Sequence, residues 1–138
     1  MEILGRYDNS GIALEGTEES LLELSDAIEK LSEVEILPLL DRQSSHDPYP
    51  GHAKSLRLVL SEEPVCIGLC GDEISVRGAA NKLKILAQNI RFVAEEKKQD
   101  SSGRIRPHVH IEYYPDHSFL KAESIPLVVT KIENSRSI

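Results

Sequence analysis

Apolar side chains recur at helical spacing in two stretches of the chain, residues 18–33 and 79–98, and this feature constrains the fold most. A helix of this kind must bury its apolar stripe against another element. Thr17 can cap the first helix, and Glu18 and Glu19 suit the positive end of its dipole. The sequence therefore predicts two amphipathic helices. Their stripes consist of Leu21, Leu24, Ile28 and Leu31, and of Ala79, Leu83, Leu86, Ile90, Val93 and Ala94.

Most of the remaining apolar residues alternate with polar ones, which predicts strands with one face on the core. Turn-forming residues separate these segments, notably at 8–11 and at Gly71-Asp72. Residues 41–53 contain two prolines, a glycine and no periodicity, so we expect a loop there. The predicted strands are residues 2–7, 11–15, 55–60 and 65–69, a returning segment with Ile74 and Val76, and residues 104–114 and 125–132.

Adjacent short strands with two separated helices favour an α+β fold over alternating βαβ units. We expect a mostly antiparallel sheet of about six or seven strands, packed against the two amphipathic helices. A chain of 138 residues has the usual size of one domain. We therefore expect a single α+β domain over residues 1–133 and a flexible C-terminal tail over 134–138.

The composition excludes several classes of protein. Hydrophobic residues make up 40% of the chain, which favours a folded domain over disorder. No apolar run approaches the roughly 20 residues that span a bilayer, and the first residues lack the pattern of a signal peptide. We therefore expect a cytoplasmic protein. The net charge is −7, and acidic residues are concentrated between Glu15 and Glu35. This charge disfavours a nucleic-acid partner, because binding phosphates requires clustered cations.

The two cysteines, Cys66 and Cys70, lie four residues apart in a predicted strand. At about 3.3 Å per residue they are too far apart for one disulfide. The chain has no Cys-x-x-Cys pair, so a zinc ribbon or a thioredoxin-like site is excluded. We expect buried, unreactive thiols.

The predicted strand 104–114 carries the strongest functional signal. Aliphatic residues and Tyr113 share one parity and are expected to face the core. The other parity is polar, and its side chains should project from one face at intervals of about 7 Å. We call this set the polar row: Arg104, Arg106, His108, His110, Glu112 and Tyr114.

Three interpretations of the polar row remain open. It is an ordinary solvated sheet face, a recognition surface in which Arg and Tyr are favoured contact residues, or a metal or catalytic site. In the metal alternative His108 and His110 would bind an ion together with loop residues His46, Asp47 and His52. The sequence contains no closed set of zinc ligands, no nucleophile elbow, no phosphate-binding glycine loop and no dinucleotide fingerprint.

The end of the chain carries a two-part motif over roughly residues 106–130. Its first part is His108-Val109-His110-Ile111-Glu112-Tyr113-Tyr114-Pro115. After a turn, its second part is the apolar strand Ser124-Ile125-Pro126-Leu127-Val128-Val129. The motif resembles the ending of the immunity protein 32 family of bacterial polymorphic toxin systems. The resemblance implies a small cytoplasmic α+β protein that binds a cognate toxin and has no catalytic residues.

We therefore expect a non-catalytic protein-binding module, of the toxin-neutralising immunity type, that needs no cofactor. Its partner would be a protein, such as a basic toxin domain, and neither nucleic acid nor a membrane. The polar row is the expected binding surface, with the acidic first helix as the alternative. Two other functions remain open: a small metal-dependent hydrolase that uses the two strand histidines, and a homo-oligomeric structural protein, for instance a homodimer.

Overall fold

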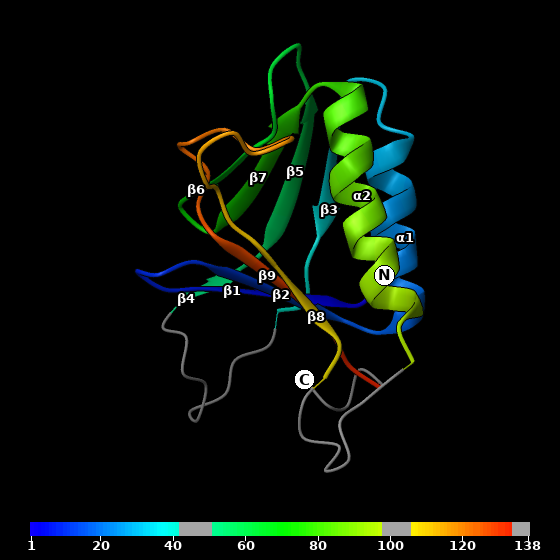
Figure 1. The fold of residues 1–138 in the computed structure, drawn as a ribbon. Helices are drawn as coiled ribbons and strands as arrows, with labels where there is room; N and C mark the ends of the chain where they lie inside the picture. Colours follow the sequence, from blue (N-terminus) through cyan, green and yellow to red (C-terminus); the bar gives the residue numbers. More distant parts are fainter. Residues whose placement is uncertain (42–50, 98–105, 134–138) are drawn as a thin grey trace.

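The computed structural model describes residues 1–41, 51–97 and 106–133, which form two helices and nine strands (Figure 1). The strands make two mixed sheets, and the fold is α+β, as predicted. The elements in chain order are β1 (Ile3–Tyr7), β2 (Ile12–Gly16), α1 (Glu18–Glu29), β3 (Val34–Pro38), β4 (Gly51–Ala53), β5 (Ser55–Leu60), β6 (Cys66–Cys70), β7 (Glu73–Gly78), α2 (Ala80–Glu95), β8 (His108–Ile111) and β9 (Leu127–Lys131).

The first sheet, here called sheet A, has the strand order β4-β1-β2-β9-β8. β1 and β2 form the predicted hairpin, in which the Asp8 carboxylate accepts hydrogen bonds from the N–H groups of Ser10 (2.7 Å) and Gly11 (3.1 Å). The Ser10 hydroxyl also donates to this carboxylate, at 2.6 Å. This hydroxyl and the two N–H groups together hold the pKa of Asp8 below its ordinary value. β2 pairs in parallel with β9, and β8 closes the sheet by antiparallel pairing with β9.

The second sheet, sheet B, has the order β3-β5-β7-β6. β6 and β7 form a hairpin around Gly71, whose φ of 61° suits the predicted turn. β7 lies between β5 and β6 and is parallel to β5. β3 pairs only with β5 among the described strands, so it is an edge strand.

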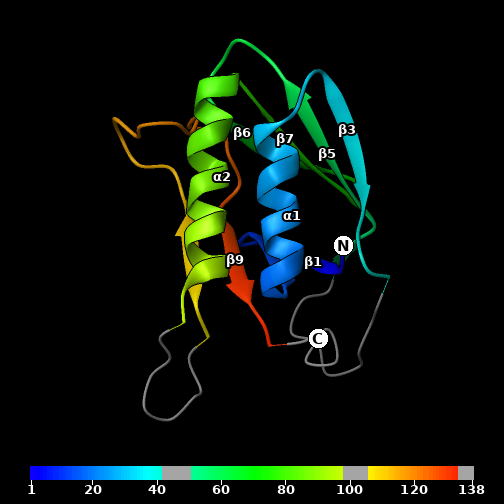
Figure 2. The ribbon, with the colours of Figure 1, turned by 90° about the vertical axis from the view of Figure 1, so that its right-hand side faces the viewer.

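The helices lie side by side against the two sheets (Figures 1 and 2). The predicted Thr17 cap is present, because its side chain accepts a hydrogen bond from the N–H of Ser20 at 3.2 Å. Ser25 is fully buried between the helices and donates to the Ala87 carbonyl at 2.8 Å. Both helices are shorter than the predicted ranges 18–33 and 79–98, so Leu31 and Ala79 lie outside them and are half-buried. The other residues of the two predicted stripes are buried, and they join the inner faces of the two sheets in one core. The buried helical residues are Leu21, Leu24, Ile28, Leu83, Leu86, Ala87, Ile90, Val93 and Ala94.

The segment between β8 and β9 connects the two sheets. Residues 119–125 run beside the start of β6, where Val65 donates to the Phe119 carbonyl at 2.7 Å and accepts from Lys121 at 2.8 Å. Lys121 also pairs with Glu63, which raises the pKa of the lysine and lowers that of the carboxyl group. This segment ties the end of β8 to sheet B.

The structure corrects several details of the predicted fold. The strands divide between two sheets instead of one, and they number nine instead of six or seven among the described residues. Most of the pairings are antiparallel, as predicted, but two are parallel. β3 was not predicted, and β4 lies inside the predicted loop 41–53. The predicted strand 104–114 is longer than β8, which begins at His108 and ends at Ile111. The predicted tail, 134–138, lies outside the described residues.

The cysteines are not buried as predicted. Cys66 is half-buried and Cys70 is exposed, and both are free thiols. The reason is the alternation along β6, which directs Ile67 and Leu69 toward the core and the two cysteines toward the opposite face.

Candidate functional site

β8 is the outer strand of sheet A, and only one of its edges is paired within the described part of the chain. The N–H of Lys131 donates to the Pro107 carbonyl at 2.9 Å. Backbone N–H and C=O groups alternate in direction along a strand, so those of Val109 and Ile111 also point toward β9. The backbone groups of His108 and His110 therefore point toward the outer edge.

The described members of the polar row are all exposed: Arg106, His108, His110, Glu112 and Tyr114. Between them, Ile111 is buried and Val109 is half-buried, so the predicted alternation is confirmed within β8. Arg104 lies outside the described residues. Tyr113 was predicted to face the core, but it is 36% exposed, because the strand ends before it.

The two histidine rings of β8 contact each other edge to face, with their centroids 5.1 Å apart. His108 Nδ1 lies 2.8 Å from the Arg106 carbonyl. A carbonyl can only accept, so Nδ1 carries the hydrogen and donates it. Nε2 is then the His108 ring nitrogen with which a partner can form a hydrogen bond.

A shallow hollow of about 190 Å³ lies beside His110 and Glu112. Its floor is the point where β2 and β9 begin to pair, with the N–H of Ile12 donating to the Pro126 carbonyl at 2.8 Å. The close approach requires Gly11, since a Cβ there would lie 2.7 Å from the same carbonyl oxygen. The hollow is lined by Ser10, Gly11, Ile12, His110, Glu112, Pro126, Leu127 and Val128.

Immediately after β8 the chain forms what we call the aromatic turn, residues 113–119. The His117 N–H donates to the Tyr114 carbonyl at 3.0 Å, and Asp116 has a φ of 65°. Pro115 followed by a positive φ is the signature of a type II turn. The His117 ring lies 4.5 Å from that of Tyr114, which is 59% exposed. The turn thus presents aromatic surface next to the polar row.

His117 also holds the turn together. Its Nδ1 accepts hydrogen bonds from the N–H groups of Phe119 (3.2 Å) and Leu120 (3.1 Å). Partial burial lowers the pKa of His117 from its ordinary 6.5. A protonated Nδ1 could accept neither bond, so the turn requires the neutral ring.

Acid should therefore loosen the aromatic turn. The pKa of His117 is lower in the folded chain than in the unfolded one, so its contribution to stability is complete above about pH 6.5 and is lost as the pH falls from there toward the folded pKa. His117→Ala should cost about 1–2 kcal/mol at pH 7.5, through two unsatisfied N–H groups, and remove this part of the pH dependence. Urea unfolding of both proteins between pH 5 and 8 tests this. An equal pH dependence in both would contradict it.

The structure does not bring together the residues of the metal alternative. His52 lies on β4 and His110 on β8, at opposite edges of sheet A. Three strands separate them, which at about 4.8 Å per step gives roughly 19 Å. His46 and Asp47 lie outside the described residues. Within residues 1–41, 51–97 and 106–133, no three metal-binding side chains gather at one point.

A second hollow, of about 640 Å³, surrounds the start of α1 and represents the acidic alternative. Of its acidic side chains, Glu23 pairs with the amino group of Met1 at 3.5 Å. The hollow is lined by Met1, Glu2, Thr17, Glu18, Glu19, Ser20, Glu23 and Glu133. All of its lining residues except Glu133 belong to the first 23 residues, and none belongs to the polar row.

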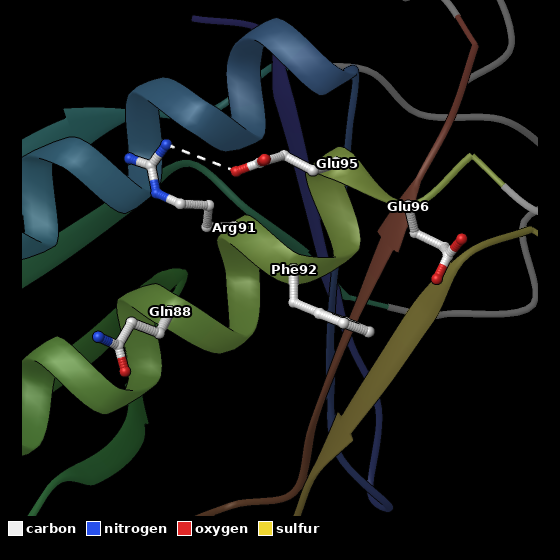
Figure 3. Close-up of a pocket in the computed structure, with 5 residues that line it drawn as sticks. All are labelled: Gln88, Arg91, Phe92, Glu95 and Glu96. Carbon is white, nitrogen blue, oxygen red and sulfur yellow. Dashed lines mark ion pairs between the residues drawn. The ribbon is translucent and has the colours of Figure 1, made fainter.

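A third surface was not predicted from the sequence. Phe92 on α2 is 71% exposed and lines a hollow of about 380 Å³ with Gln88 and Glu96 (Figure 3). Arg91 points toward α1, where it pairs with Asp26 at 2.5 Å, while Phe92 projects away from that contact (Figure 3). A phenylalanine outside the stripe 83, 86, 90, 93 was the signal that could have revealed this surface.

Comparison with known protein families identifies the second half of this architecture. Residues 73–132 match the model of the Immunity protein 32 family. This segment of the chain is Immunity protein 32-like. The match extends well beyond the motif seen in the sequence: it includes β7, α2, β8, the aromatic turn and β9. The resemblance inferred from the C-terminal motif is thereby confirmed.

The match includes the described polar row and Phe92, but none of the residues that line the acidic hollow. A search of curated proteins found no match to the chain. Neither described helix is long and apolar enough to cross a membrane.

Proposed function

We propose that this chain is an immunity protein that neutralises a toxin by binding it, without catalysis, through the polar row and the aromatic turn. The observation that carries the proposal is the family match over residues 73–132, which includes both parts of this surface. The preference for this surface over the acidic hollow has the same basis, because every residue that lines that hollow lies outside the match.

The chemistry of the surface suits recognition. Arg106 offers a planar cation, Glu112 an anion, and the two β8 histidines further hydrogen-bonding groups. Tyr114 supplies an aromatic side chain that is 59% exposed. Arg and Tyr are enriched among the residues that dominate the binding energy of protein interfaces. The outward-facing backbone groups of β8 add hydrogen-bonding positions of fixed geometry.

The test begins with a search for a toxin domain encoded beside the gene for this chain, and then produces that domain together with the chain in bacterial cells. The wild-type chain should bind the toxin and restore growth. The triple variant Arg106→Ala, His108→Ala, Tyr114→Ala should bind it about 1,000-fold or more weakly, since truncating one dominant contact costs about 2 kcal/mol. All three side chains are exposed, so the unfolding transition should not change.

Two controls locate the binding surface. Phe92→Ala removes another exposed aromatic side chain, on α2. A triple alanine variant of Glu18, Glu19 and Glu23 removes acidic side chains of the second hollow. Both should protect the cells as the wild-type chain does. Loss of protection in the acidic variant, with protection kept in the polar-row variant, would reassign the surface. If the wild-type chain neither binds the toxin nor restores growth, the proposed function is wrong.

A further inference from the structure

The outer edge of sheet B is built from β3, whose apolar side chains are exposed. Val34 is 54% exposed and Ile36 is 51% exposed. Figure 2 shows β3 at the margin of the molecule, on the side away from β7. Sheet edges in natural proteins are ordinarily covered or bear charged side chains, because an exposed apolar edge pairs with other strands. β3 bears one such charge, Glu35, and the proline Pro38, but the two apolar side chains beside them remain exposed, so the edge is suited to an occupant.

The hydrogen bonds of β3 show which backbone groups the edge offers. The Glu33 carbonyl accepts a hydrogen bond from the Leu60 N–H at 2.8 Å, and the Leu39 N–H donates to the Lys54 carbonyl at 3.0 Å. The backbone groups of Glu33 and Leu39, on either side of β3, therefore point toward the chain of β5. Alternation then directs the backbone of every second residue, Val34, Ile36 and Pro38, toward the open edge. Proline has no N–H. The edge thus has two donors, at Val34 and Ile36, and three acceptors.

We infer that the occupant is a second copy of this chain, whose β3 pairs antiparallel with the first about a two-fold axis at Ile36. In this register Ile36 and its counterpart exchange two hydrogen bonds, and each Val34 N–H donates to the Pro38 carbonyl of the other copy. All four donors of the two edges are matched. Because Pro38 has no N–H, the Val34 carbonyl opposite it accepts no hydrogen bond across the interface and is left to bind water.

The charges on β3 favour this register over its neighbours. A two-fold axis at Glu35 would set the two Glu35 carboxylates directly opposite each other, which is destabilising. An axis at Leu37 would pair Ile36 with Pro38 and leave fewer hydrogen bonds. With the axis at Ile36, Glu35 lies opposite Leu37. The exposed side chains of Val34, Ile36 and Pro38 then join those of the second copy in one apolar strip.

The pairing leaves the polar row accessible, because β3 and β8 belong to different sheets. A dimer could therefore present two toxin-binding surfaces. The inference does not depend on the proposed function, and the two fail separately: one concerns the mass of the chain alone, the other its capture of a toxin.

The mass of the wild-type chain in solution tests the inference. An interface of one strand pair is small, so sedimentation equilibrium should cover about 5 to 500 µM. The mass should rise toward twice 15.4 kDa with concentration. Ile36→Lys, which opposes two ammonium groups at the axis, should remain a monomer throughout, while Phe92→Lys, at another exposed apolar position, should dimerise as the wild type does. A monomeric wild type, or a dimeric Ile36→Lys, would overturn the inference.

Crosslinking tests the register itself. In a background with Cys66→Ser and Cys70→Ser, Ile36→Cys places two thiols across the axis, with Cα atoms about 5.5 Å apart. This separation lies within the range that disulfides require, so mild oxidation should yield covalent dimers. Glu35→Cys is the matched control, because its two copies are offset by two residues and should crosslink at least tenfold more slowly. Faster crosslinking through position 35 than through position 36 would refute the register.

Discussion

The free energy of unfolding of the Ile74→Ala variant is expected to be about 3–4 kcal/mol lower than that of the wild-type chain. Ile74 is fully buried on β7, and its Cδ1 approaches β1 of the other sheet. The approach is possible because the facing residue is Gly5, where an added Cβ would lie 3.2 Å from that Cδ1. Removing the side chain of Ile74 leaves a cavity that Gly5 has no side chain to fill. Cavities that cannot collapse lie at the costly end of such substitutions.

Urea unfolding at pH 7.5 measures this loss, and Phe92→Ala is the control. It removes an even larger apolar side chain, but one that is 71% exposed, so the free energy of unfolding should change by no more than about 0.5 kcal/mol. Equal losses in the two variants would mean that the sheets do not meet at Gly5 and Ile74. A loss in Ile74→Ala near 1 kcal/mol would show that the neighbouring side chains close the gap.

Sequence patterns correctly predicted the elements that are formed by contacts between residues close together in the sequence. The two helices follow from the spacing of Leu21 and Leu24 and of their counterparts in α2, and Thr17 marked the first helix start. The β1–β2 hairpin followed from Asp8 and Gly11, whose contacts are also local. Such elements can be predicted because the interactions that form them lie within a few consecutive residues.

The division into two sheets depends on contacts between distant segments, and the sequence pattern does not contain them. The parallel pairing of β2 with β9 joins Ile12 to Leu127, and alternation alone cannot choose that partner over an adjacent strand. β3 was missed for a different reason. All but one of its residues are exposed, so the strand 34–38 has no buried face to produce alternation.

The candidate site was predictable only in part. Alternation correctly placed His108 and His110 on the exposed side of β8 and Ile111 in the core. It failed at Tyr113, because period-two alternation holds only as long as the strand does, and the chain turns at Pro115. The role of His117 also depends on the folded turn, since its acceptor atom faces two N–H groups that come together only there.

Gly11→Ala is expected to lower the free energy of unfolding by about 2–3 kcal/mol and to weaken toxin capture as well. The new Cβ would lie 2.7 Å from the Pro126 carbonyl oxygen, which belongs to the backbone and cannot rotate away. Relief requires the start of β9 to move, and that movement stretches the hydrogen bond from Ile12 to the same oxygen. Overpacking of this kind costs about 1–3 kcal/mol, and the weakened hydrogen bond about 1 more.

Gly68→Ala is the matched control, because its Cβ would meet only the Ser75 hydroxyl, at 3.0 Å, which can rotate. Its free energy of unfolding should stay within about 0.5 kcal/mol of wild type or rise slightly. Hydrogen exchange of the folded Gly11→Ala protein should show faster exchange in β8 and β9 than in β5 and β7. Since β9 holds β8 in place, a variant that stays folded but presents the polar row poorly should lose toxin binding. Unchanged exchange in β9 together with full binding would show that the junction beside the hollow does not position the polar row.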